Sequence, residues 1–123
     1  MLPRHPRWWA KLFWLVVMIV MVLLLMPLGD NPNPGIDHLD KMVHALIFMG
    51  LAVLALRAWP KHLLRIFLGL VLLAALTEML QGLTGWRTAS VADFVADVIG
   101  IALIYVVHFL VTLLSYRAVR KTS

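Results

Sequence analysis

The sequence predicts an all-α membrane protein, a bundle of four transmembrane helices with both termini on the cytoplasmic side. Three observations predict this fold. Apolar residues make up 63% of the 123-residue chain, well above the about 45–50% of soluble domains. Four segments are long and apolar enough to cross a hydrocarbon core, which takes about 20 helical residues. Basic and acidic residues alternate between the connections that separate these segments.

The four apolar segments predict helices over residues 8–26, 38–58, 62–83 and 90–116. Lipid cannot hydrogen-bond to backbone groups, so these segments are expected to cross as helices. The first segment has the basic start of a signal peptide, but its apolar run is too long and no A-x-A-like cleavage site follows, which favours a retained helix. Residues 29–37, "GDNPNPGID", predict a loop. The chain 1–123 is interpreted as one domain.

The charged residues indicate the topology. The two termini and the connection between the second and third segments carry only basic residues, which are Arg4, Arg7, Lys11, Arg57, Lys61, Arg65, Arg117, Arg120 and Lys121. All six acidic residues lie in or beside the other two connections, accompanied by Lys41 and Arg87. The positive-inside rule therefore places both termini in the cytoplasm and the acidic connections outside.

Three short patterns carry the polar residues of the apolar segments. They are "DKMVH" with Asp40, Lys41 and His44; "EMLQ" with Glu78 and Gln81; and "RTASVADFVADVIG" with Arg87, Asp93, Asp97 and Gly100. Within each pattern, spacings of three, four or seven residues place side chains on one helix face. The candidate ligand-binding residues are Asp40, Lys41, His44, Glu78, Gln81, Arg87, Asp93 and Asp97.

Helix spacing also indicates how deep these residues lie. His44 and Asp97 each follow an expected helix start by seven residues, which is about 10 Å at 1.5 Å per residue. Glu78 precedes Gly82, an expected helix end, by four residues or about 6 Å. The helices alternate in direction, so the three side chains are expected at similar depth beneath the outer surface. If their faces converge, they form one polar pocket there.

Each polar residue also has a structural interpretation. Asp37 is a natural helix N-cap, and Ser90 with Asp93 matches the S-x-x-D capping pattern. Glu78 and Asp97 do not fit such roles. Glu78 lies near a helix C-terminus, where the macrodipole disfavours an anion, and Asp97 is too deep to cap a helix. A small-residue packing face is expected at Ala92, Ala96 and Gly100.

The three patterns, in this order, resemble the VanZ-like family of small multi-pass bacterial membrane proteins. The resemblance covers about residues 37–107 and rests on Asp40, Lys41, His44, Glu78, Gln81, Arg87, Asp93 and Gly100. The chain departs from the family pattern at Asp97, where asparagine is frequent. The resemblance implies a protein of the bacterial cytoplasmic (inner) membrane with a role in the cell envelope. The family name comes from resistance to a glycopeptide antibiotic, so altered sensitivity to such antibiotics is an expected phenotype.

The favoured function is an outward-facing polar pocket that binds the headgroup of an envelope lipid or a lipid-linked cell-wall precursor. Lys41 and Arg87 would bind phosphate or carboxylate groups. No cofactor is expected, although the carboxylates offer ligands for a divalent cation that bridges to phosphate. Expected partners are membrane lipids, a second copy of the chain or another membrane protein. Nucleic acid is excluded because the basic residues form no continuous stripe.

Three other function classes stay open. A proton or ion transporter is the least favoured, because between Asp97 and the inner surface the fourth segment carries only His108 as an acidic or basic residue within the apolar span. The polar residues can serve assembly alone, by joining the outer ends of three helices in a membrane subunit without a ligand. Alternatively, the protein is a hydrolase or transferase on lipid headgroups, with Glu78 or Asp97 as general base and His44 as proton shuttle. No established catalytic motif is present, and the nearby hydroxyls of Thr84, Thr88 and Ser90 indicate no nucleophile, so catalytic residues are not assigned. The absence of cysteine excludes a thiolate site.

Overall fold

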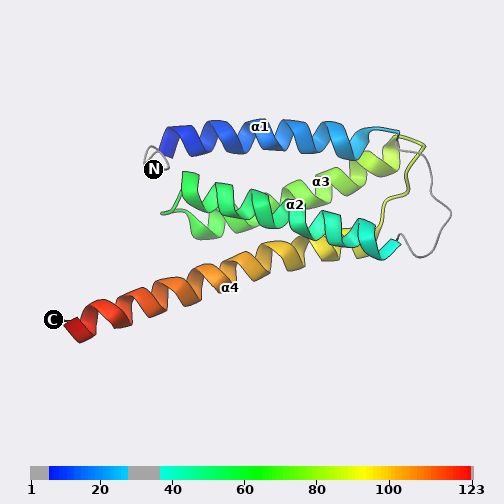
Figure 1. Ribbon diagram of the computed structural model, residues 1–123. Helices are drawn as coiled ribbons and strands as arrows, with labels where there is room; N and C mark the ends of the chain where they lie inside the picture. Colours follow the sequence, from blue (N-terminus) through cyan, green and yellow to red (C-terminus); the bar gives the residue numbers. More distant parts are fainter. Residues whose placement is uncertain (1–5, 28–36, 123) are drawn as a thin grey trace.

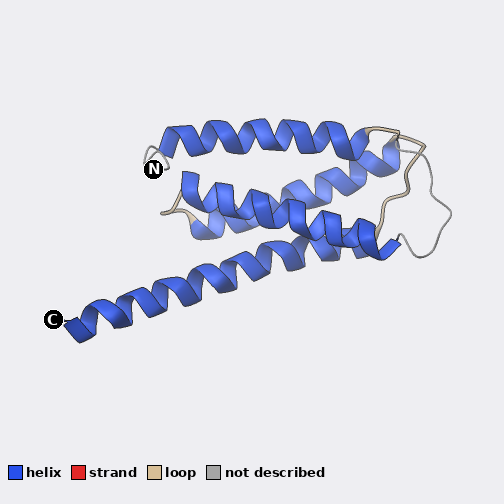
Figure 2. Ribbon diagram, in the orientation of Figure 1, coloured by secondary structure: helices blue, strands red, loops and turns tan. Residues whose placement is uncertain are grey.

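The computed structural model describes residues 6–27 and 37–122, and all regular secondary structure in these ranges is helical (Figure 1, Figure 2). The helices are α1 (Pro6–Leu25), α2 (Asp37–Ala58), α3 (Leu63–Leu83) and α4 (Val91–Thr122). Consecutive helices run in opposite directions, so α1 begins and α4 ends at the same end of the bundle (Figure 1). Arg4, Asp30 and the predicted loop 29–37, apart from its last residue, lie outside the described residues.

Each of these helices is long and apolar enough to cross a membrane. The apolar spans are Arg7–Leu25, His38–Ala58, Leu63–Leu83 and Val91–Thr122. Large apolar side chains are exposed on all of them, among them Met18, Leu46, Leu72 and Phe109. Soluble proteins rarely expose apolar surface on this scale. The chain is therefore a multi-pass integral membrane protein.

The predicted helix boundaries agree with the structure to within two residues, except at the C-terminal end of α4. That end was expected at residue 116 and lies at Thr122. Basic residues end the apolar stretch of α4 but do not end the helix. At 1.5 Å per residue the 32 residues of α4 span about 48 Å, more than a hydrocarbon core of about 30 Å. The last turns, with Arg117, Arg120 and Lys121, extend beyond the other helices (Figure 1).

Helix α2 lies at the centre of the bundle, where it packs most extensively against α4 and then against α1. The core is built around α2 side chains that are nearly inaccessible to solvent, which are Phe48, Leu51, Ala52 and Ala55. Leu70 and Ala74 of α3 and Ile101 of α4 complete it from the other side. These apolar contacts hold α2, α3 and α4 together along their middle turns, and so fix how their ends meet.

The bundle has two chemically different ends. The acidic end, where α1 and α3 end and α2 and α4 begin, carries Asp40, Glu78, Asp93 and Asp97. The basic end, where α1 begins, α2 passes to α3 and α4 ends, is closed by aromatic and cationic contacts. The guanidinium of Arg57 lies 5.6 Å from the ring centroid of Trp9, and the Tyr105 hydroxyl donates to the Leu63 carbonyl oxygen at 2.6 Å. The candidate site residues all belong to the acidic end.

Candidate functional site

Three helices bring His44, Glu78 and Asp97 into contact at the acidic end, and we call these residues the deep triad. His44 comes from α2, Glu78 from α3 and Asp97 from α4. The Nδ1 atom of His44 lies 3.1 Å from Asp97 Oδ1 and 3.8 Å from Glu78 Oε1. His44 and Asp97 are 0% exposed and Glu78 is 6% exposed. Helix spacing predicts a common depth for these residues, and the structure shows that their faces also converge, which places an imidazole and two carboxylates together inside the bundle.

Gly100 allows α4 to approach α2 closely enough for this contact. A Cβ atom at Gly100 would overlap the carbonyl oxygen of Ala45 and lie 3.1 Å from its carbonyl carbon. Ala45 follows His44 in sequence, and Gly100 lies one turn beyond Asp97. The backbone contact therefore sets the separation between the two triad residues. Of the predicted small-residue face, Ala92 is exposed and Ala96 is half-buried, so the close approach is made at Gly100.

Glu78 of α3 lies against the N-terminus of α4. The backbone N–H of Ser90, which precedes the first residue of α4, donates to Glu78 Oε2 at 2.9 Å. The Ser90 Oγ in turn accepts from the Asp93 backbone N–H at 3.2 Å, as the capping pattern predicts. A carboxylate is disfavoured at the end of its own helix α3, but the positive end of the α4 dipole stabilises it. Glu78 therefore joins α3 to α4.

Two ion pairs lie about one helical turn from the deep triad, closer to the starts of α2 and α4, and we call them the rim pairs. Arg87, in the connection between α3 and α4, donates through Nη2 to Asp40 Oδ1 and Oδ2 at 3.3 and 3.2 Å. Lys41 Nζ lies 3.7 Å from Asp93 Oδ1, within ion-pair range but beyond hydrogen-bond distance. The Arg87 and Lys41 side chains are partly exposed. The rim pairs and the deep triad together form the polar cluster.

Gln81 was grouped with these residues from sequence, but its amide points to α1. Its Nε2 donates to the Leu24 carbonyl oxygen at 3.0 Å. The indole N–H of Trp86, a residue that sequence reasoning did not single out, donates to the Leu25 carbonyl oxygen at 3.2 Å. Both side chains satisfy carbonyl groups that the last turn of a helix leaves unpaired. They attach α1 to the acidic end.

Two of the three hydroxyls near the polar cluster make local hydrogen bonds. The Thr84 hydroxyl donates to the Gln81 carbonyl oxygen at 2.6 Å, and the Ser90 hydroxyl caps α4. Thr88 is exposed in the connection between α3 and α4. The structure adds no nucleophile–base pair to the polar cluster among these three hydroxyls, so it gives no support to an acyl-transfer type of chemistry.

Unsatisfied polar atoms are concentrated in the polar cluster. Among the described residues, the buried side-chain nitrogen and oxygen atoms without a hydrogen-bond partner are His44 Nε2, Glu78 Oε1, Asp93 Oδ1 and Asp97 Oδ2. Native proteins leave few such atoms, and each calls for an explanation such as a bound ion or water. Their location in one cluster, on three helices, makes this cluster the candidate functional site.

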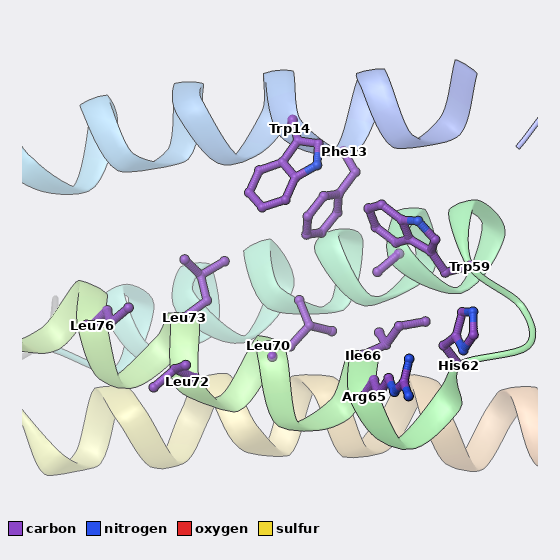
Figure 3. A pocket seen from close by; sticks show the side chains of 12 residues that line it. Phe13, Trp14, Trp59, His62, Arg65, Ile66, Leu70, Leu72, Leu73 and Leu76 are labelled. Carbon is purple, nitrogen blue, oxygen red and sulfur yellow. The ribbon is translucent and has the colours of Figure 1, made fainter. Parts of the chain in front are cut away.

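Two cavities help to define access to this site. A pocket of about 240 Å³ between α3 and α4, which we call the Glu78 pocket, is lined by Ala75, Glu78, Met79, Ala89, Ser90, Val91 and Phe94. A larger pocket of about 530 Å³ lies between α1 and α3, lined mainly by apolar side chains such as Phe13, Leu70 and Leu73 (Figure 3). The larger pocket does not reach the polar cluster. The deep triad is thus packed closely, with the Glu78 pocket beside it.

Comparison with known proteins identifies no relative. No protein-family model, no curated protein and no solved structure matches the chain. The membrane architecture therefore rests on the helices themselves, and the VanZ-like resemblance rests on the three sequence patterns.

Proposed function

We propose that this protein binds the polar headgroup of an envelope lipid, or of a lipid-linked cell-wall precursor, at its acidic end. One observation carries the proposal: three helices contribute buried side-chain atoms without hydrogen-bond partners to one cluster. Polar atoms without partners are costly at membrane depth. A ligand with hydroxyl, amide or phosphate groups supplies the missing partners.

The rim pairs give this site its preference for anionic groups. Arg87 and Lys41 are the cations of the cluster, and guanidinium and ammonium groups can donate strong charge-assisted hydrogen bonds to an anionic ligand. Arg87 contacts both Asp40 oxygens through the single nitrogen Nη2, at 3.2 and 3.3 Å, and Lys41 lies 3.7 Å from Asp93. A phosphate or carboxylate can therefore displace these contacts, while the carboxylates accept hydrogen bonds from sugar hydroxyls or amide groups.

The proposed orientation has the acidic end outside and both termini in the cytoplasm of a bacterial cell. The basic residues gather at the opposite end, as the positive-inside rule requires of cytoplasmic connections. The VanZ-like patterns support the same location in the cytoplasmic membrane. On this proposal, loss of the protein changes sensitivity to antibiotics that target the envelope, glycopeptides included.

Lipid analysis of the purified protein tests the proposal. The protein is extracted with its surrounding lipid in polymer-bounded discs, and the lipids that accompany wild type, Glu78→Ala and Thr112→Ala are compared. Thr112 is an exposed residue whose hydroxyl bonds only within α4, so its variant is the matched control. We expect one headgroup class enriched with wild type and Thr112→Ala but lost with Glu78→Ala. Equal lipid profiles for all three, with all three folded, would overturn the proposal.

Assembly without a ligand is the second candidate, favoured by the bonds that the same residues make between helices. Glu78 joins α3 to α4, and Arg87 joins the α3–α4 connection to α2. On this alternative the polar residues stabilise the bundle, and its exposed apolar faces bind another subunit. Glu78→Gln would then reduce abundance in the membrane. A fully abundant Glu78→Gln protein with an envelope defect would exclude it.

A further inference from the structure

The deep triad has the geometry of a metal site. One ligand atom from each of His44, Glu78 and Asp97 lies within 4.8 Å of the others. His44 Nδ1 lies 3.1 Å from the Asp97 oxygen and 3.8 Å from the Glu78 oxygen. These separations bracket the about 3.3 Å expected between neighbouring ligand atoms at bond lengths of about 2.0–2.1 Å in tetrahedral geometry. The Glu78 and Asp97 oxygen atoms lie within 4.8 Å of each other, so closing the triad to a spacing of about 3.3 Å requires side-chain movements of no more than about 1.5 Å.

The charges of the polar cluster divide in a way that leaves the triad negative. Each rim pair joins one cation to one carboxylate, Arg87 to Asp40 and Lys41 to Asp93. In the forms that bind a metal, two ionised carboxylates and a neutral imidazole, the deep triad would carry a formal charge of −2, and buried charge must be balanced. One divalent cation balances it.

The unsatisfied atoms supply an independent observation. Glu78 Oε1 has no hydrogen-bond partner and faces the His44 ring. Asp97 Oδ2, on a residue with no exposed surface, also has none. An ion held between the three side chains would have Glu78 Oε1 and either carboxylate oxygen of Asp97 within reach as ligands. Carboxylate atoms of Asp40 and Asp93 also lie within 4.8 Å of a His44 ring nitrogen, whereas His44 Nε2 has no hydrogen-bond partner.

We propose that His44, Glu78 and Asp97 form a binding site for a divalent transition-metal cation of the Zn²⁺ or Mn²⁺ type. One imidazole with two carboxylates suits these ions, whereas Mg²⁺ and Ca²⁺ prefer oxygen ligands alone. Three protein ligands leave a coordination position open. In the function proposed above, on which this last step rests, a headgroup phosphate or carboxylate oxygen fills that position, reached beside Glu78.

Metal binding by the purified protein tests this site directly. Wild type, Glu78→Gln and Asp97→Asn are purified in lipid discs, stripped with chelator, dialysed against Zn²⁺ or Mn²⁺, and analysed by mass spectrometry for bound metal and by titration for Kd. Gln and Asn keep the size of the side chain, and Gln keeps an oxygen acceptor for Ser90. His62→Gln is the control, because His62 is an exposed histidine at the basic end.

We expect one metal ion per chain for wild type and for His62→Gln. In Glu78→Gln and Asp97→Asn the Kd should rise at least about 100-fold, because loss of a direct ligand weakens binding more than the about 10–100-fold typical of changes in the residues that surround the ligands. Far-ultraviolet circular dichroism checks that each variant is helical. Wild type without bound Zn²⁺ or Mn²⁺, or folded variants that bind as wild type does, would overturn the site. Lipid enrichment without bound metal would overturn the metal site and leave the headgroup proposal standing. Bound metal without lipid enrichment would overturn the headgroup proposal and leave the metal site standing.

Discussion

Gly100 of α4 lies against the backbone of Ala45 of α2, with no room between them for a β-carbon. The contact occurs one turn below the point where Asp97 and His44 meet. Small residues at such crossings allow helices in a membrane to pack backbone to backbone. The approach of α4 to α2 therefore depends on residue 100 being a glycine, and so does the geometry of the deep triad.

Gly100→Ala is accordingly expected to destabilise the protein, although alanine is the better helix former. The added methyl group meets a backbone carbonyl that cannot rotate away, and overpacking of this kind costs about 1–3 kcal/mol. Reversible unfolding in mixed detergent measures the change. Gly50→Ala and Gly69→Ala are the controls, because a Cβ there meets nothing within 4 Å. If all three variants unfold alike, the close contact does not govern stability.

Glu78 gives a prediction about how α3 and α4 are joined. Glu78→Ala removes the acceptor of the Ser90 backbone N–H. Ser90 is partly buried, so the unpaired donor is expected to cost about 1 kcal/mol, the lower end of the range for buried donors. Glu78→Gln retains an oxygen in that place. We therefore expect Glu78→Ala to be the less stable variant, with faster hydrogen exchange at the start of α4. Equal exchange in the two variants would show that the Ser90 bond contributes little.

The helices could be predicted closely because their signals are local. Apolar runs of membrane length, ended by charged or turn-forming residues, locate α2 and α3 to within one residue. The end of α4 could not be located this way, because Arg117 to Lys121 leave the apolar run without breaking the helix. Hydropathy reports where a chain leaves lipid, and only caps or breakers report where a helix stops.

The site was predictable in part for a similar reason. Spacing and depth predict that His44, Glu78 and Asp97 lie at one level, and the structure brings them together. Spacing says nothing about partners on other helices. Gln81 follows Glu78 by three residues, yet it bonds to α1, and the Ser90 N–H that Glu78 accepts belongs to the next helix. Because α3 and α4 are apolar on all sides, periodicity could not indicate which face meets which neighbour.

The rim pair of Arg87 and Asp40 is expected to contribute little to stability. Both side chains are partly exposed, 21% and 37%, and exposed ion pairs contribute about 0–1 kcal/mol. A double-mutant cycle with Arg87→Gln and Asp40→Asn measures their coupling, which added salt should weaken further. A coupling well above this range, unaffected by salt, would show that the pair is desolvated. A low coupling energy would mean that Arg87 can exchange Asp40 for an anionic ligand at little cost.

Attachment of α1 gives a separate prediction. Gln81→Leu leaves the Leu24 carbonyl oxygen without its buried donor, which is expected to cost about 1–3 kcal/mol. Trp86→Phe removes the bond to Leu25 at a residue that is 47% exposed, so its effect should be smaller. Hydrogen exchange along α1, followed by mass spectrometry, measures both. Faster exchange confined to the last turns of α1 is expected. Exchange altered instead around His44 would mean that Gln81 belongs to the deep triad.

The orientation of the acidic end can be tested in a chain without cysteine. Thr88→Cys places a thiol in the exposed connection between α3 and α4, and Thr122→Cys places one at the exposed end of α4. An impermeant maleimide added to intact cells should label Thr88→Cys, and should label Thr122→Cys only after lysis, because basic residues stay in the cytoplasm. Ala74→Cys, at a core position with no exposed surface, is the control that should react in neither condition. The opposite labelling pattern would place the acidic end in the cytoplasm, and the headgroup would then come from the inner leaflet.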